Sequence, residues 1–143
     1  MKELIISNKS RQLLFVGHIH AGTVPDFMIL QKEFPPKNDW FKDLTVRIDL
    51  GFQGFKDKYK SKEADIPHKR KRVAKGKSNE LTDIQKEENK ALGKERIYVE
   101  HSIGGFKRFR ILVNRLRIKS TYLINQIVGV CAALWNFSLC LKC

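Results

Sequence analysis

The stretch RIYVEHSIGGFKRF, residues 96–109, decides how this chain is interpreted. Arg96, Glu100 and Lys107 follow one another at offsets of four and seven, which places them on one face of a helix. Such a stripe indicates one of two things. It is either a solvated face with an ion pair, which stabilises a helix by roughly a few tenths of a kcal/mol, or a carboxylate held between two cations for chemistry.

A long helix is expected around this stretch, over residues 83–113. Thr82 and Gln85 fit a capping box, in which the two side chains satisfy each other's backbone N–H groups. Three glycines interrupt the pattern, and each costs about 1 kcal/mol relative to alanine in a helix interior. The helix therefore either breaks at these positions or allows another group to approach its backbone closely. They are Gly93, Gly104 and Gly105.

The residues before this helix predict strands and one short helix. Apolar runs at 4–6 and 13–16 flank a polar turn and predict a hairpin. A short helix is expected from Asp26 to Phe34, ended by two prolines, and a third strand over 44–48. The fold class predicted from this order is α/β, with a long helical region at the C-terminal end.

Asp49 comes directly after the third predicted strand, in a loop position where catalytic and ligand-binding carboxylates are common. Together with Glu100 it would supply two hard oxygen ligands of the kind that Mg²⁺ or Mn²⁺ prefers. Two such ions can activate a water or hydroxyl and stabilise the leaving oxygen of a phosphodiester. The spacing therefore suggests phosphodiester chemistry as a hypothesis, with flanking cations holding the phosphates.

The composition indicates an anionic partner. The chain of 143 residues carries 28 Lys and Arg against 15 Asp and Glu, a formal net charge of +13. This charge favours nucleic acid or an acidic membrane surface, and the composition excludes a collagen-like, disulfide-stapled or wholly disordered chain. Three cysteines, an odd number, favour a reducing compartment, so we expect a cytoplasmic protein.

The segment 56–79 is polar and strongly basic, without apolar periodicity. It is expected to be a loop, either simply solvated or acting as a clamp on an anionic ligand. The cations predicted to bind DNA in this segment are Lys69, Arg70, Lys71 and Arg72.

The segment 120–141 contains no charged residue and is long enough to span a membrane. Asn125, Gln126 and Asn136 would be costly in hydrocarbon without partners. Apolar residues recur in it at helical spacing, so a buried packing helix is favoured over a span. They are Ile124, Ile127, Val128, Cys131, Leu134 and Trp135.

His18 and His20 stand two residues apart at the end of a predicted strand. Two imidazoles could suggest a metal site, but the neighbouring sequence offers no third ligand. We therefore expect a surface or packing pair.

Four blocks then occur in a familiar order. GTVPDF (22–27) is similar to a G-x-x-H-D pattern, with Pro25 in place of the histidine, and RIDLGFQG (47–54) to D-x-G-[YF]-x-G. LTDIQKEEN (81–89) is similar to an LT…Q…N pattern, and residues 96–109 to R-I-x-V-E-H-x-I-G-x-x-K-R-F. In these blocks the chain resembles, over nearly its whole length, the transposases of bacterial insertion sequences in the DDE superfamily.

The resemblance implies a ribonuclease H-like fold, a mixed sheet flanked by helices. Asp49 would be the second catalytic carboxylate and Glu100 the third, both binding Mg²⁺ or Mn²⁺. The family nicks DNA at transposon ends and joins the free 3′-hydroxyl to a target strand. The residues expected to contact DNA along the last block and beyond it are Arg96, Lys107, Arg108 and Arg110.

The chain departs from the family in its first part. The family's first catalytic aspartate lies on a strand upstream of the hairpin, and no Asp precedes Asp26 here. Residues 1–143 are therefore interpreted as the C-terminal part of a transposase catalytic domain, inactive without an N-terminal complement and active as a homo-oligomer or with that complement. A decayed copy, an internal start or the second frame of a split element would each explain it. The alternatives are a non-catalytic DNA-binding remnant and a membrane-anchored basic protein spanning 120–141.

Overall fold

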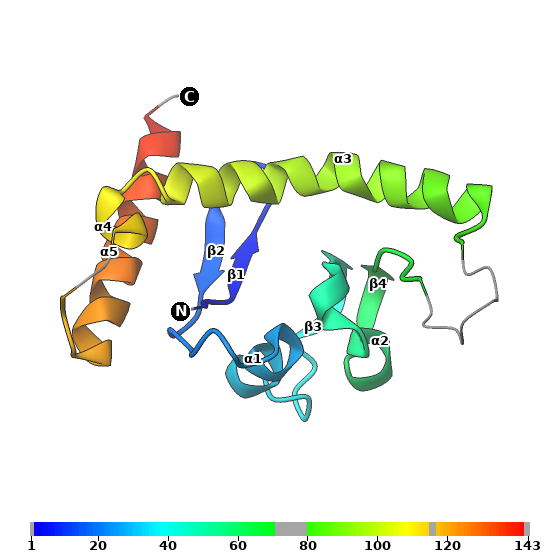
Figure 1. The fold of residues 1–143 in the computed structure, drawn as a ribbon, viewed down its shortest axis with the longest axis horizontal. Coiled ribbons are helices and arrows are strands. Elements are labelled where there is room, and N and C mark those ends of the chain that lie inside the picture. Colours follow the sequence, from blue (N-terminus) through cyan, green and yellow to red (C-terminus); the bar gives the residue numbers. More distant parts are fainter. Residues whose placement is uncertain (1, 71–79, 115–116, 142–143) are drawn as a thin grey trace. The chain divides into compact units, whose positions relative to one another are not determined.

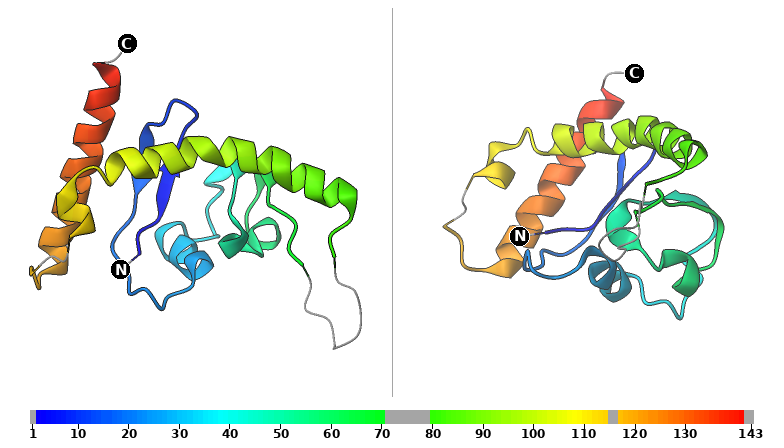
Figure 2. Two further views of the ribbon diagram at one scale, coloured as in Figure 1. Left: turned by 45° about the horizontal axis from the view of Figure 1, so that its top comes forward. Right: turned by 45° about the vertical axis from the view of Figure 1, so that its right-hand side comes forward.

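The computed structural model describes residues 2–70, 80–114 and 117–141, and they form two compact units. One unit comprises Met1–Glu33 and Ile97–Cys143, and the other comprises Phe34–Arg96. Figures 1 and 2 show the elements along the chain. In order they are β1 (Ile5–Ser7), β2 (Leu13–Val16), α1 (Asp26–Glu33), β3 (Phe41–Arg47), the 3₁₀ helix η1 (Leu50–Phe52), α2 (Phe55–Lys58), β4 (Ser61–Asp65), α3 (Asp83–Phe106), α4 (Arg110–Val113) and α5 (Thr121–Cys140).

The predicted hairpin is confirmed. Strands β1 and β2 pair antiparallel, with Ile5 opposite Val16 and a register shift after Ile6. The turn is closed by Asn8, whose side-chain oxygen accepts from the backbone N–H of Gln12 at 2.9 Å. The short helix α1 also begins at Asp26, as the sequence predicts, and ends at Glu33.

Helix α5 packs against strand β2 and forms the core of its unit (Figure 1). The favoured interpretation of 120–141 as a packing helix is confirmed for one of its faces, although Leu134, predicted to be buried, is 49% exposed. The buried residues of this cluster come from α5, β2 and the end of α3. They are Leu13, Phe106, Ile124, Val128, Cys131, Ala132 and Trp135.

Two amides on α5 hold the hairpin by its backbone. Asn136 accepts from the N–H of Leu13 at 2.8 Å and donates to its carbonyl at 2.9 Å. Asn125 accepts from the N–H of Ile19 at 3.0 Å. Two of the three amides that would be costly in hydrocarbon thus have backbone partners inside the protein, whereas Gln126 is exposed and bonds to the Tyr122 hydroxyl.

Helix α3 is continuous over Asp83–Phe106 and begins with the predicted capping box (Figure 2). The N–H of Thr82 donates to Gln85 Oε1 at 3.1 Å, and the N–H of Gln85 donates to Thr82 Oγ1 at 3.3 Å. The expected end near Val113 was wrong. The helix stops at Phe106, and α4 follows separately, so Lys107 lies in the turn after α3 and not on it.

None of the three glycines breaks α3, and one of them admits a close neighbour. A Cβ built on Gly105 would lie 2.0 Å from Cη2 of Trp135, so the indole ring sits directly against the helix backbone. At Gly93 and Gly104 a Cβ would meet nothing within 4 Å, and no contact explains a glycine there. Gly105 is therefore what allows α3 and α5 to pack together.

The second unit contains a parallel strand pair, of which β3 covers most of the predicted third strand and β4 lies where the sequence predicted a loop. Strand β3 pairs with β4, with Thr45 opposite Glu63 and Arg47 opposite Asp65. All of β4 and all but the first residue of α2 lie within 56–79, so the prediction of a loop was wrong for the first part of that segment. The polar sequence of β4 (SKEAD) hid the strand, because backbone pairing with β3 rather than apolar burial holds it.

The expected single mixed sheet is not seen among the described residues. They form one antiparallel and one parallel two-stranded sheet, each in its own unit. In the hairpin, β1 and β2 form their backbone hydrogen bonds with each other. Strand β3 pairs with β4, which follows it after the crossover of residues 48–60.

An aromatic cluster anchors this crossover. The rings of Phe55 and Tyr59 stack with centroids 4.9 Å apart, and Phe41 at the start of β3 packs on Phe55 at 5.4 Å. The Tyr59 hydroxyl donates to the carbonyl of Phe34 at 2.7 Å. The loop after β3 is therefore held between β3 and α2 by buried aromatic side chains.

Candidate functional site

Asp49 stands at the carboxyl end of β3, as predicted, and one oxygen of its carboxylate, Oδ1, makes two contacts. Its Oδ1 accepts from the N–H of Leu50 at 2.7 Å, which caps helix η1. The same oxygen lies 3.1 Å from Nη1 of Arg96 on α3. The side chains are 53% and 43% exposed, so this acidic group remains reachable from solvent.

A second tie joins the same part of α3 to the ends of both strands. Arg47, the last residue of β3, forms an ion pair with Glu95, and its Nε lies 3.7 Å from Oδ2 of Asp65 at the end of β4. Glu95 and Arg96 are neighbours on α3 and contact two positions at the end of β3. Helix α3 therefore holds the end of β3 and the Asp49 side chain that follows it in place.

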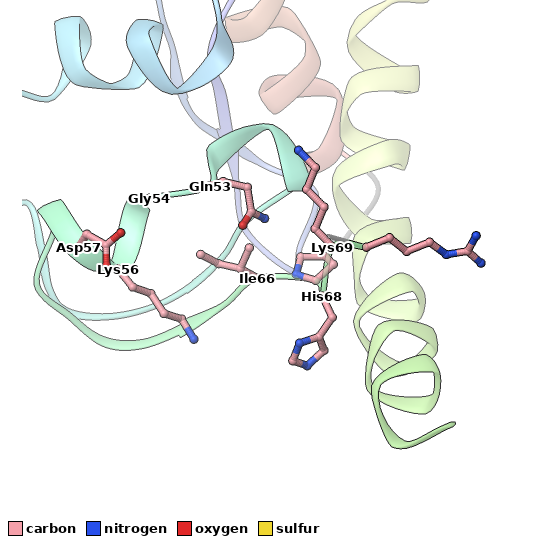
Figure 3. A pocket seen from close by; sticks show the side chains of 9 residues that line it. Gln53, Gly54, Lys56, Asp57, Ile66, His68 and Lys69 are labelled. Atoms are coloured by element: carbon pink, nitrogen blue, oxygen red, sulfur yellow. The ribbon is translucent and has the colours of Figure 1, made fainter. Parts of the chain in front are cut away.

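A pocket of about 760 Å³ opens beyond the carboxyl ends of the two parallel strands (Figure 3). One wall is the crossover after β3, and the other is the segment that leaves β4. Ligands commonly bind at such an edge of a parallel sheet. The lining residues are Gln53, Gly54, Lys56, Asp57, Ile66, Pro67, His68, Lys69 and Arg70.

The segment leaving β4 is tied to α3 by His68. Its N–H donates to Asn89 Oδ1 at 2.7 Å, and Asn89 Nδ2 donates back to the His68 carbonyl at 3.1 Å. Its Nε2 lies 2.6 Å from a carboxylate oxygen of Glu88. Figure 3 shows the His68 ring and the Lys69 ammonium pointing to opposite sides of the segment. The tether therefore leaves the Lys69 side chain directed away from the contacts of His68.

The pocket is cationic. Lys56, Lys69 and Arg70 line it with exposed side chains, against the single carboxylate of Asp57. Across residues 2–70, 80–114 and 117–141, no carboxylate forms an ion pair with any of these three cations. Their charge is therefore available to an anion. Lys71 and Arg72, predicted to act with them, lie outside the described residues.

The remaining predicted residues belong to the other unit. Glu100 is exposed on α3, near the buried Ser102, whose hydroxyl donates to the Tyr98 carbonyl at 2.9 Å. Lys107 and Arg108 are exposed in the turn after α3, and Arg110 is exposed at the start of α4. The structure thus brings Asp49 together with Arg96. Glu100 and Asp49 stand in different units.

Among the residues that the structure describes, no cluster of metal ligands is assembled around Asp49. Asp49 Oδ1 already forms an ion pair with the guanidinium of Arg96. A metal ion that bound this oxygen would have to compete with that group. Within the described part of the chain, no three His, Cys, Asp or Glu side chains are placed to hold an ion together. The predicted pair of metal ligands, Asp49 and Glu100, therefore stays a prediction.

The contact of Glu33 with His18 and His20 was not predicted from the sequence. Glu33 is the last residue of α1, and its Oε1 lies 3.3 Å from His18 Nδ1 and 3.2 Å from His20 Nε2 and accepts from the His18 N–H at 3.0 Å. Burial raises the pKa of the Glu33 carboxyl, but hydrogen bonds from His20 and His18 outweigh it, so the net pKa is lowered. Sequence spacing could not reveal this, because only the fold brings residue 33 to the strand end.

Comparison with known proteins gives two matches. Residues 1–136 match the model of a family described as DDE superfamily endonuclease. The chain is also 31% identical, over 143 aligned residues, to the "Probable transposase for insertion sequence element IS702" of Microchaete diplosiphon. That alignment covers 98% of this chain and 46% of the relative, so the chain spans less than half of the relative's length. No solved structure gives a significant match.

Proposed function

Because the chain belongs to the DDE superfamily of endonucleases, we propose that it acts on DNA as the C-terminal part of a transposase catalytic domain. The observation that carries the proposal is the cationic pocket at the carboxyl ends of β3 and β4, on the edge where Asp49 stands. DDE superfamily endonucleases generally use divalent metals, and transposases act on DNA.

We further propose a ribonuclease H-like fold that is only partly present in these residues. In support, β3 has one strand partner, β4, among the described residues, and Leu44 on β3 is 53% exposed. A strand with a half-exposed apolar side chain and a free edge is suited to pairing with a further strand. In the family that strand would carry the first catalytic aspartate.

The pocket is proposed to bind the phosphates of the DNA backbone. Lys56, Lys69 and Arg70 supply the charge, and the His68–Asn89 tether fixes the segment that carries two of them. Backbone binding of this kind releases counterions, so the affinity falls steeply with salt. Lys107, Arg108 and Arg110 are proposed as further phosphate contacts.

The test is a salt titration of duplex affinity, measured by fluorescence anisotropy with the full chain. The double variant Lys69→Ala/Arg70→Ala should lower the affinity and reduce the slope of log K against log salt by about 0.9 per lost phosphate contact. The matched control, Lys37→Ala/Lys42→Ala, removes the same charge away from the pocket lining and should keep the slope. A wild-type slope in the pocket variant would refute the pocket as the DNA site.

The isolated chain is proposed not to catalyse strand transfer. Asp49 and Glu100 would supply two of the family's three carboxylates, with Mg²⁺ or Mn²⁺ as the proposed ion and an N-terminal complement supplying the third. Purified chain should therefore leave supercoiled DNA intact in Mg²⁺. Robust nicking that Glu100→Gln abolishes would overturn this proposal.

The second candidate is a non-catalytic DNA-binding remnant. The Arg96 guanidinium on Asp49 favours it, since the carboxylate already has a cation as partner. A titration with Mn²⁺ separates the two candidates, because both predict the same salt dependence. The catalytic portion predicts a Mn²⁺ affinity that falls in Asp49→Asn, whereas the remnant predicts the same Mn²⁺ affinity in both proteins.

A further inference from the structure

The contact between Arg96 and Asp49 closes one oxygen of the carboxylate on which the proposed chemistry depends. Asp49 Oδ1 lies 3.1 Å from Nη1 of Arg96 and also accepts from the N–H of Leu50 at 2.7 Å. Two donors therefore share the lone pairs of this oxygen, and a cation that approached it would have to displace the guanidinium. The family resemblance implies a metal ion on Asp49, whereas the structure shows this carboxylate holding a cation of the protein.

The Arg96–Asp49 pair is weak enough to be exchanged for another contact. Its side chains are 43% and 53% exposed. An exposed ion pair of this kind changes an equilibrium constant by at most about fivefold. A phosphate offers a guanidinium two parallel, charge-assisted hydrogen bonds. A DNA phosphate within reach can therefore replace Asp49 as the partner of Arg96.

Helix α3 carries Arg96 on the same face as the residue that holds the segment after β4. Asn89 lies seven residues before Arg96, which is two helical turns and about 10 Å along the helix axis. Asn89 is bonded to the backbone of His68 and thereby holds the segment that carries Lys69 and Arg70. The phosphates of one DNA strand follow one another at about 3.4 Å along the duplex axis. A strand bound at these two cations and running along this face of α3 therefore presents a further phosphate to Arg96.

The end of strand β3 stays in place when Arg96 leaves Asp49. Arg47, the last residue of β3, forms an ion pair with Glu95 on α3, and its Nε lies 3.7 Å from Oδ2 of Asp65. These contacts involve neither Arg96 nor Asp49. Opening the Arg96–Asp49 pair is therefore a local change of one side chain.

We propose that Arg96 is a latch on Asp49 that bound DNA opens. The guanidinium passes from Asp49 Oδ1 to a backbone phosphate, so the carboxylate accepts a divalent cation more readily while DNA is bound. This inference rests on the proposed function, in which DNA lies at this edge and Asp49 is a metal ligand. By linkage, DNA and the cation then strengthen each other's binding by the same factor. The latch is autoinhibitory, because the chain without DNA withholds the carboxylate.

The first measurement needs no metal. The duplex affinity of the full chain is measured in EDTA by fluorescence anisotropy over a range of salt concentrations. Arg96→Gln should reduce the slope of log K against log salt by about 0.9, the value for one lost phosphate contact, and Arg96→Lys should restore the slope. An unchanged slope in Arg96→Gln would show that the guanidinium stays on Asp49, and would overturn the latch.

A double-mutant cycle under the same conditions tests the exchange itself. Asp49→Asn should raise the duplex affinity about two- to fivefold, because Arg96 then leaves no carboxylate behind, and the gain should be smaller in the Arg96→Gln background. The control Asp57→Asn removes another exposed carboxylate from the same unit and should give the same gain in both backgrounds. Equal gains from Asp49→Asn in the two backgrounds would contradict the proposal.

Mn²⁺ binding to the chain without DNA, followed by electron paramagnetic resonance, separates failure of the latch from failure of the proposed function. Arg96→Gln should bind Mn²⁺ about two- to fivefold more tightly than wild type, and Asp49→Asn/Arg96→Gln should lose this gain. Equal Mn²⁺ affinities of wild type and Arg96→Gln would overturn the latch. The absence of Mn²⁺ binding to either protein would instead refute Asp49 as a metal ligand of this chain, and the salt slope would then decide the exchange alone.

Discussion

Nη1 of Arg96 lies 3.1 Å from Oδ1 of Asp49, so a helix residue contacts the carboxylate that follows strand β3. In the family's pattern these residues belong to two separate sequence blocks, and here they form one ion pair within the same unit. The pair gives the carboxylate a cation from the protein itself. Any metal ion that binds Asp49 Oδ1 has to compete with this guanidinium.

Asp49→Asn should change the stability very little. Both side chains of the pair are about half exposed, and exposed ion pairs contribute about 0 to 1 kcal/mol. Urea unfolding followed by circular dichroism should therefore give a free energy of unfolding within about 1 kcal/mol of wild type. A much larger loss would mean that Asp49 mainly supports the fold, and its use as a functional probe would then be unsafe.

Gly105→Ala should destabilise the protein by about 1 to 3 kcal/mol or more, because the new methyl would collide with the Trp135 ring at 2.0 Å. Gly104→Ala is the matched control, since a Cβ there meets nothing within 4 Å. Alanine is the better helix former, so the control should gain roughly 0.5 to 1 kcal/mol. Urea unfolding of both variants measures this, and equal effects of the two substitutions would contradict the close packing of Trp135 on Gly105.

Glu33 should make the protein less stable in acid. Its pKa is lowered in the folded state, so its stabilisation is complete above the ordinary value of 4.5 and is lost as the pH falls through the lowered pKa. Glu33→Gln should cost about 1.5 to 3 kcal/mol at neutral pH, the usual range for hydrogen bonds to a charged group. Unfolding measured between pH 3 and 7 should show the two proteins converging at the acidic end. A difference that is constant over this range would show that the charge of Glu33 does not contribute.

Asn136→Ala should cost about 1 to 3 kcal/mol, because it leaves the N–H and carbonyl of Leu13 without their partner. Gln126→Ala is the control on the same helix, since Gln126 is exposed and its side chain bonds to the Tyr122 hydroxyl one turn away on that helix. Thermal unfolding should show a clear drop in the melting temperature for the first variant and little change for the second. The reverse order would contradict the role given to Asn136.

Local signals in the sequence predicted several elements well. The hairpin, the start of α1, the capping box at Thr82 and the extent of α5 follow from short-range patterns of turns, caps and apolar spacing. Strand β4 could not be predicted this way, because its polar residues carry no periodic signal and its pairing partner β3 lies before a crossover. The end of α3 was placed too late, although the pair Gly104 and Gly105, which the sequence offered as a possible break, directly precedes its last residue, Phe106.

The sequence by itself determined the family motifs, the placement of Asp49 after a strand and of Glu100 on a helix, and the basic character of the chain, because these depend on residue type and local spacing. Only the tertiary structure decided which groups meet. It paired Arg96 with Asp49, joined Glu33 to two histidines, seated Trp135 on Gly105 and gathered Lys56, Lys69 and Arg70 around one pocket. Such contacts join residues from separate elements, and their formation depends on how the whole chain packs, which no local pattern encodes.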